Sequence, residues 1–229
     1  MNMRTKILQI IFVLTAAVMT NASAQNVVPF YENGIAGYKD ATTGQVVIPA
    51  QYHSASMMMP WGKSGDYYAV LSYEGKFGCI NQSGATIIPF MYEFIDKFTG
   101  GFARAEMNGK YGYINMNNET VIPFEYDMAG RVSNGMARVE KNGRWGFINM
   151  TTKTVTPFDY IGANDYSEGL AAVMNSNGQW GFIDVNGNYV IAPQYIKAES
   201  FENGQAIVHN GNDFLHINTA GQVVGIGGR

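Results

Sequence analysis

The sequence has few of the residues that form disulfides and bind metals. Its 229 residues include one cysteine, Cys79, and three histidines, His53, His209 and His216. A single cysteine has no internal disulfide partner, and no histidine lies at a short ligand spacing from another histidine or from the cysteine. We therefore expect a fold without disulfides, without a metal and without a cofactor.

Charge and long apolar runs are also scarce. Charged residues make up 14% of the chain, and its formal net charge is −3. A basic surface is the usual mark of a nucleic-acid partner, so this acidic balance argues against one. After the first 24 residues no apolar run approaches the length of about 20 residues that a membrane-spanning helix needs. We expect no membrane span in the rest of the chain.

The first 24 residues are typical of a signal peptide. Basic Arg4 and Lys6 precede an apolar run over residues 7–18, and a small-residue Ala-Ser-Ala motif ends at Ala24. This pattern predicts cleavage between Ala24 and Gln25. The mature chain is then expected to be exported to the periplasm, to the cell surface or to the medium.

The chain is rich in a recurring pair of an aromatic residue and a glycine. Four glycines of the same motif are spaced 34, 34 and 35 residues apart, at Gly78, Gly112, Gly146 and Gly181. Aromatic residues precede them, at Phe77, Tyr111, Trp145 and Trp180. A fixed period of this size indicates one supersecondary unit stacked on copies of itself.

Each motif lies in a predicted β-hairpin. Residues 102–107 and 110–115 alternate in character around Asn108-Gly109, a pair that favours a two-residue type I′ turn. That turn fixes the register, so that Ala105 faces Gly112. In the fifth unit a three-residue loop absorbs one extra residue, and Val173 is expected to face Gly181.

The hairpin has two unlike faces. Its small-residue face carries Ala103, Ala105, Gly112 and Ile114, and its aromatic face carries Arg104, Glu106, Tyr111 and Tyr113. A glycine inside a strand usually signals the close approach of another backbone. We expect the small-residue face to be the packing face.

Prolines recur in step with the motif. A third strand precedes each of them, and proline either stops a strand or lies at a sheet edge; they are Pro49, Pro89, Pro123, Pro157 and Pro193. Each unit is thus predicted to be a three-stranded meander followed by an irregular link. The domain at 25–229 divides into six units, at about 27–65, 66–100, 101–134, 135–168, 169–203 and 204–229. The last unit lacks both the glycine and the proline, as an end cap does.

These motifs are similar to those of a known family. Gly-Arg-Trp-Gly-Phe-Ile at 143–148 and Glu-Gly-Leu-Ala-Ala-Val at 168–173 resemble the unit of bacterial WG-repeat proteins, KWG repeats included. The chain departs from that pattern with Tyr38, Phe77 and Tyr111 in place of tryptophan. The resemblance implies an all-β interaction module and supplies no catalytic residues. We expect an open array, with a closed β-propeller as the alternative.

The aromatic face offers the candidate binding residues. Aromatic and arginine side chains are enriched at binding hot spots; the candidates are Arg104, Tyr113, Arg138, Trp145 and Phe147, with Trp61 from an insertion at 57–61. The alternative is that these side chains pack between units, with each arginine over an aromatic ring and beside Glu106 or Glu140.

Three functions remain open at this point. The first is a non-catalytic interaction or scaffold module of the cell envelope with an unknown protein partner, and the second is a module that binds glycan or cell-wall polysaccharide. A hydrolase that uses Asp127, Asp159 or Asp165 is less favoured, because aspartates beside turns bind local backbone. His53 with residues 57–59 could provide soft ligands for Cu(I), but an inserted loop that covers an apolar edge explains them better.

Overall fold

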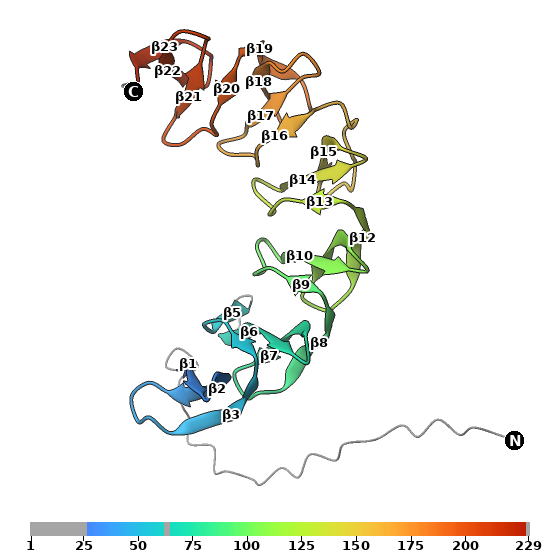
Figure 1. Ribbon diagram of the computed structural model, residues 1–229, viewed down its shortest axis with the longest axis vertical. Coiled ribbons are helices and arrows are strands. Elements are labelled where there is room, and N and C mark those ends of the chain that lie inside the picture. Colours follow the sequence, from blue (N-terminus) through green and yellow to red (C-terminus); the bar gives the residue numbers. More distant parts are fainter. Residues whose placement is uncertain (1–26, 62–64, 228–229) are drawn as a thin grey trace, which may run out of the picture.

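The computed structural model describes residues 27–61 and 65–227, and every regular element in these ranges is a β-strand. The predicted signal peptide at 1–24 and its cleavage site lie outside the described residues. The strands form six small antiparallel sheets, which follow one another along an arc whose two ends stay apart (Figure 1). The all-β open array is therefore confirmed, and the closed propeller is not formed. No helix among the described residues has the length and apolar character needed to cross a bilayer.

The sheets are numbered 1 to 6 along the chain. Sheet 1 contains β1 (Val27–Glu32), β2 (Ile35–Asp40) and β3 (Val46–Tyr52). Sheet 2 contains β4 (Ser54–Ala55), β5 (Met59–Trp61), β6 (Asp66–Tyr73), β7 (Lys76–Asn81) and β8 (Thr86–Tyr92). Sheet 3 contains β9 (Phe94–Ile95), β10 (Phe102–Met107), β11 (Lys110–Asn115) and β12 (Thr120–Tyr126). Sheet 4 contains β13 (Met128–Ala129), β14 (Met136–Lys141) and β15 (Arg144–Asn149). Sheet 5 contains β16 (Gly162–Ala163), β17 (Ala171–Met174), β18 (Trp180–Ile183) and β19 (Tyr189–Tyr195). Sheet 6 contains β20 (Lys197–Ala198), β21 (Gln205–His209), β22 (Phe214–Asn218) and β23 (Val223–Ile226).

Five sheets begin with a two-residue strand that the sequence did not predict. In sheet 3, β9 pairs with β10 through Ile95 and Ala105 and through Phe94 and Glu106. The link after each third strand is therefore not wholly irregular, because its first residues join the next hairpin. Sheet 3 begins at Phe94, ahead of the predicted unit bound at residue 101.

The hairpin register agrees with the prediction. Ala105 lies opposite Gly112, and Val173 lies opposite Gly181. At the turn Asn108 and Gly109 have φ angles of 55° and 69°, the two positive values that a type I′ turn requires. A glycine at the second position adopts this conformation without steric cost.

The motif glycine and the proline act together within one sheet. Pro123 lies inside the outermost strand β12, where it needs no ladder partner, and the register between β11 and β12 shifts around it. This bulge brings the carbonyl oxygen of Ile122 to 2.7 Å from where a Cβ on Gly112 would lie. The close backbone that the glycine signals is therefore that of the outer strand of the same sheet.

Sheet 4 is the looser version of this arrangement. Residues after Lys153 form no third strand there, and isolated bridges join Ile148 to Val155 and Trp145 to Tyr160. The nearest backbone oxygen, that of Thr156, is 3.1 Å from a Cβ built on Gly146. The glycine of sheet 4 is therefore less crowded than that of sheet 3.

Five apolar clusters hold the six sheets together, one at each joint. At the joint between sheets 3 and 4, Tyr113 and Tyr126 of sheet 3 pack with Ala137, Val139 and Ile148 of sheet 4. The aromatic face of one sheet therefore lies on the small-residue face of the next. Both faces of an internal sheet are packing surfaces.

Candidate functional site

Two of the predicted binding residues lie in the core. Tyr113 and Phe147 each have 0% of their surface exposed, because the next sheet covers them. The Tyr113 hydroxyl donates a hydrogen bond to the carbonyl oxygen of Gly130 in the next sheet, at 2.6 Å. The prediction that these rings belong to an exposed binding face is wrong.

The two predicted arginines also link neighbouring sheets. Arg104 donates to the carbonyl oxygen of Ala129 at 2.6 Å, and Arg138 donates to that of Ala163 at 2.5 Å. The guanidinium of Arg138 lies 5.0 Å from the ring centre of Trp145. This is the packing arrangement that the sequence left as the alternative.

The carboxylates beside the arginines differ from those that the sequence suggested. Arg104 lies 3.1 Å from Asp96 and Arg138 lies 2.7 Å from Asp165, where Glu106 and Glu140 were expected. The Nε of Arg138 approaches Asp165 without hydrogen-bond geometry, so their contact is an ion pair alone. Both aspartates follow the short inner strands, which explains why alternation within the hairpin did not reveal them.

Trp61 is part of an aromatic cluster. Its ring centre lies 5.1 Å from that of Tyr68 and 5.4 Å from that of Phe98. The insertion that contains it was expected to be a loop, but Met59–Trp61 forms β5 and pairs with β6. Trp61 is half-buried there and packs across the joint between sheets 2 and 3.

The loops after the short inner strands line the concave edge of the arc (Figure 1). We call this surface the concave edge; in sheets 3 to 6 it consists of residues 96–101, 130–135, 164–169 and 199–204. Hydroxyl groups tie its loops together. Ser133 donates to the carbonyl oxygen of Tyr166, and Ser167 donates to that of Phe201, both at 2.6 Å. The edge is therefore a continuous surface, and the recurring serine before a turn was the sequence signal for it.

Asp96 is the electrostatic centre of this edge in sheets 3 and 4. Arg131 of the next sheet binds its two oxygens at 2.8 and 3.2 Å, and Arg104 binds one of them. Burial acts to raise the pKa of Asp96, but the ion pairs and hydrogen bonds outweigh it, so the pKa is lowered. Asp96 thus remains a carboxylate at neutral pH.

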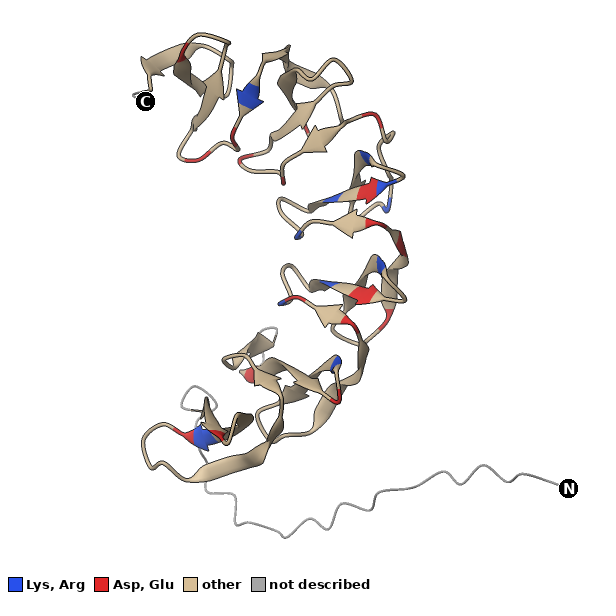
Figure 2. Ribbon diagram, viewed as in Figure 1, with Lys and Arg blue, Asp and Glu red and all other residues tan. Residues whose placement is uncertain are grey.

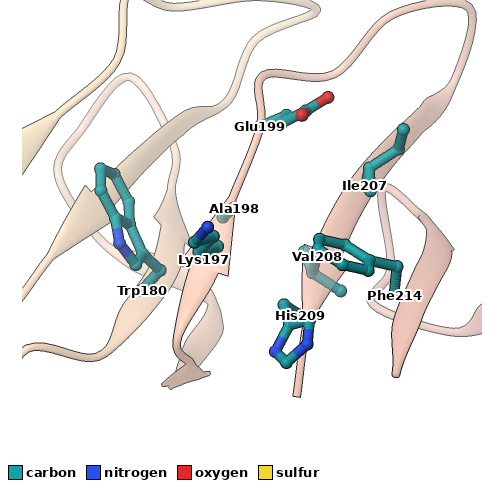
Figure 3. A pocket seen from close by; sticks show the side chains of 8 residues that line it. All are labelled: Trp180, Lys197, Ala198, Glu199, Ile207, Val208, His209 and Phe214. Atoms are coloured by element: carbon teal, nitrogen blue, oxygen red, sulfur yellow. The ribbon is translucent and has the colours of Figure 1, made fainter. Parts of the chain in front are cut away.

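A hollow of about 200 Å³ opens near the C-terminal end of the array, at β20. Figure 3 shows Trp180 reaching it from sheet 5 and His209 and Phe214 reaching it from sheet 6. In sheet 5, Ala172 occupies the position that Arg138 has in sheet 4, so no guanidinium covers the indole of Trp180. Lys197 and Glu199 add charge to the lining.

The single cysteine has a structural place. Cys79 is fully buried at the position that Tyr113 occupies in sheet 3, and burial raises the pKa of its thiol to about 12. Within the described ranges, no group of three or more His, Cys, Asp or Glu side chains is arranged to hold a metal ion. Met58 and Met59, from the suggested Cu(I) segment, pack against apolar clusters.

The repeat geometry agrees with a comparison with known families. The model of the WG containing repeat matches residues 77–111, 111–145, 145–178 and 180–212, which together are more than half of the chain. The chain belongs to the WG-repeat family. In the structure, sheet 1, strands β4 to β6 of sheet 2 and the end of sheet 6 extend this WG-repeat array beyond the matched residues.

Solved structures resemble the array in fold. A structure of the eukaryotic initiation factor has a TM-score of 0.56 and 11% identity, over 90% of this chain and 64% of that one. BamB from Moraxella catarrhalis has a TM-score of 0.49 and 12% identity, over 88% of this chain and 69% of that one. The chain thus spans less than two thirds of the initiation factor, and at such identities the likeness concerns fold alone. No curated protein matches the sequence.

Proposed function

We propose that this WG-repeat chain is an exported, non-catalytic interaction module whose concave edge binds a protein partner in the cell envelope. The observation that carries the proposal is the concave edge itself, where one loop from each of sheets 3 to 6 reaches the same side of the arc (Figure 1). Curved repeat arrays bind partners along such extended surfaces. The inter-sheet hydrogen bonds made by Ser133 and Ser167 preorganise this one.

The charges of the concave edge suggest how a partner is oriented. Exposed Lys97 and Arg131 lie on sheets 3 and 4, and four acids follow on sheets 5 and 6 (Figure 2). The acids are Asp165, Glu168, Glu199 and Glu202. A partner with the opposite order of charges would dock in one direction only, because complementary potentials set the orientation of an encounter.

Two of the three aspartates of the hydrolase hypothesis, Asp127 and Asp165, have structural contacts. Asp127 forms an ion pair with Lys110 and accepts a hydrogen bond from the amide of Asn142, and these contacts lower its pKa. Asp165 is paired with Arg138. A glycosidase needs one carboxyl group that stays protonated as the general acid, with a raised pKa. The lowered pKa of Asp127 does not fit the general acid, and the ion pair of Asp165 with Arg138 gives that side chain a structural role.

The hollow at β20 supports glycan binding as the second candidate function. Trp180 offers an indole without a covering guanidinium, and Glu199 is an acceptor beside it. Pockets that enclose drug-sized ligands measure about 300–1,000 Å³, so a hollow of about 200 Å³ fits one sugar ring at most. Trp180→Ala should abolish binding to purified wall polysaccharide if this function is correct.

A capture experiment separates the two candidates. Purified chain is immobilised and incubated with envelope extract, and the Arg131→Glu variant is compared with Lys141→Glu. Both residues are cations in ion pairs between side chains, but Arg131 pairs with Asp96 at the concave edge and Lys141 pairs with Glu125 away from it. We expect Arg131→Glu to reduce capture of a specific protein about tenfold or more and Lys141→Glu to leave it unchanged. Equal capture by both variants would contradict binding at the concave edge.

Export has an independent test. The predicted signal peptide requires that mature protein recovered from the envelope begins at Gln25. Intact-mass measurement decides this, and recovery of chains that still begin at Met1 would contradict the proposed processing.

A further inference from the structure

The two ends of the array expose the two halves of its repeated joint. At an internal joint the aromatic-face position is fully buried, with 0% exposure at Tyr38, Cys79, Tyr113, Phe147 and Phe182. The small-residue-face position is buried equally, with 0% exposure at Ile80, Ile114, Ile148, Ile183 and Ile217. Sheet 6 has no following sheet among the described residues, and sheet 1 has no preceding one. Among the described residues, therefore, nothing covers one half of this joint at each end.

The C-terminal end face is the outer face of sheet 6. We define it by Ile207, His216, Phe214 and Glu199. Ile207 pairs with His216 as Arg104 pairs with Tyr113 in sheet 3, and both side chains are partly exposed. Phe214 has 37% of its surface exposed. Glu199 joins this face because its amide bonds to the carbonyl oxygen of Ile207.

Glu199 is the one charged residue among the four that define the C-terminal end face. Terminal repeats usually carry a polar outer face, which keeps the array soluble and monomeric. Here β21, β22 and β23 contain no Asp, Glu, Lys or Arg residue (Figure 2). Exposed apolar surface that is gathered at one place usually marks an interaction site.

The N-terminal end face is the outer face of sheet 1. It consists of Val28, Phe30 and Lys39, which correspond to Ala103, Ala105 and Ile114 in sheet 3. All three side chains are partly exposed. Lys39 is a cation, whereas Glu199 gives the opposite end face an anion, and neither forms an ion pair with another of the described residues.

We infer that two copies of this chain associate head to tail, with the C-terminal end face of one copy packed on the N-terminal end face of the next. The contact repeats the internal joint, in which Tyr113 of one sheet packs with Ala137, Val139 and Ile148 of the next. Ile207 and His216 of one copy therefore lie on Val28, Phe30 and Lys39 of the next. Because the two faces differ, the interface is heterologous and adds copies in one direction. The C-terminal end face shares Glu199 with the concave edge, but its other three residues lie outside that edge. Either association can therefore hold without the other.

A pair of charge variants tests the inference. Ile207→Lys places a cation opposite Lys39, and it should fold because two other sheets have arginine at this position. Lys39→Glu replaces the cation of the N-terminal end face with an anion, and the face that meets it carries Glu199. Sedimentation velocity of the wild-type chain should show a weight-average mass that rises above the monomer mass with concentration. Each variant alone should weaken this association about tenfold or more.

Mixing the two variants supplies the decisive result. In an equimolar mixture the altered faces attract each other and the unaltered faces remain compatible, so association should return to within a few-fold of the wild-type strength. Lys97→Glu, an exposed charge change in the middle of the array, is the matched control and should associate normally. Circular dichroism establishes that each variant is folded.

Three results would overturn the inference. The first is a wild-type chain that stays monomeric at all concentrations, which would make both end faces simple caps. The second is association that Ile207→Lys abolishes and Lys39→Glu leaves intact, which would indicate that two C-terminal end faces pair with each other. The third is a mixture of folded variants that fails to associate.

Discussion

Sheets 3 and 6 share one hairpin register but differ in almost every residue that defines the repeat. Tyr113 of sheet 3 corresponds to His216 of sheet 6, and Gly112 corresponds to Leu215. Sheet 3 lies between two neighbours, whereas the described part of sheet 6 touches only sheet 5. The comparison shows that backbone pairing needs only the alternation and the turn. The buried ring is needed where a following sheet packs on the hairpin. The glycine is needed where a bulged edge strand lies close to the central strand.

The motif position requires glycine where the adjacent edge strand has a bulge. In sheet 6, His216 pairs with Gly225 and Leu215 pairs with Ile226 without a shift between them. No carbonyl is pushed against Leu215, and a side chain fits there. In sheet 3 the proline-containing strand shifts its register at the same place, and only glycine fits.

The largest expected difference concerns the aromatic position. Tyr113→Ala removes a fully buried ring and its hydrogen bond to Gly130, so we expect a loss of about 3–5 kcal/mol in the free energy of unfolding. His216→Ala removes a partly exposed side chain and should change that free energy by less than about 1 kcal/mol. Urea denaturation of both variants measures the difference. Equal losses would mean that the two faces are covered to the same extent.

The stability lost when a motif glycine is replaced by valine should increase with the crowding around that glycine. Gly112→Val places a side chain 2.7 Å from a backbone oxygen, which should cost at least about 1–3 kcal/mol. Gly146→Val should cost less, because its nearest backbone oxygen lies at 3.1 Å. Midpoints of urea unfolding give the order, and a larger loss for Gly146→Val would show that crowding by the edge strand does not explain the motif.

The arginines of sheets 3 and 4 should matter less than the buried ring. Arg138→Ala removes the hydrogen bond to Ala163 and the guanidinium over Trp145, so we expect a loss of about 1–2 kcal/mol. Lys141→Ala is the control, because Lys141 and its partner Glu125 are 40% and 48% exposed and a surface ion pair contributes less than about 1 kcal/mol. If Arg138→Ala alters partner capture but leaves the thermal midpoint unchanged, Arg138 acts in partner binding and its packing between sheets contributes little to stability.

The smallest expected effect is a dependence on pH. The folded-state pKa of Asp96 lies below its ordinary value of 3.8, so its contribution to stability is complete above that value and is lost as the pH falls toward the folded pKa. Asp96→Asn should therefore flatten the decline in stability below about pH 4. Urea midpoints between pH 2.5 and 6 test this, and parallel curves for the two proteins would contradict the lowered pKa.

The sequence was sufficient for the parts of the fold that depend on local chemistry. Asn108-Gly109 fixes a two-residue turn, and alternation on either side fixes which side chains share a face. The short strand at Phe94 was missed because two residues have no periodicity to detect. Pro123 was compatible with both a strand end and an edge, and the structure shows the edge.

The candidate site was harder to predict for a physical reason. Alternation separates Tyr113 and Arg104 from Ala103 and Ala105, but it does not show whether one face or both are covered. A lone sheet commonly leaves one face in water, whereas a stacked sheet buries both. The concave edge depends on contacts between residues about one repeat apart, such as Ser133 with Tyr166, and one unit read by itself does not reveal them.

Amide hydrogen exchange tests most directly whether covered faces, more than the hairpins themselves, give the array its stability. β11 and β22 are equivalent central strands, but sheets pack on both faces of β11 and on only one face of β22. We expect the paired amides of β11 to exchange at least about tenfold more slowly than those of β22, which corresponds to about 1.4 kcal/mol. The measurement is made at low protein concentration, where copies stay apart. Equal protection of the two strands under these conditions would contradict the account.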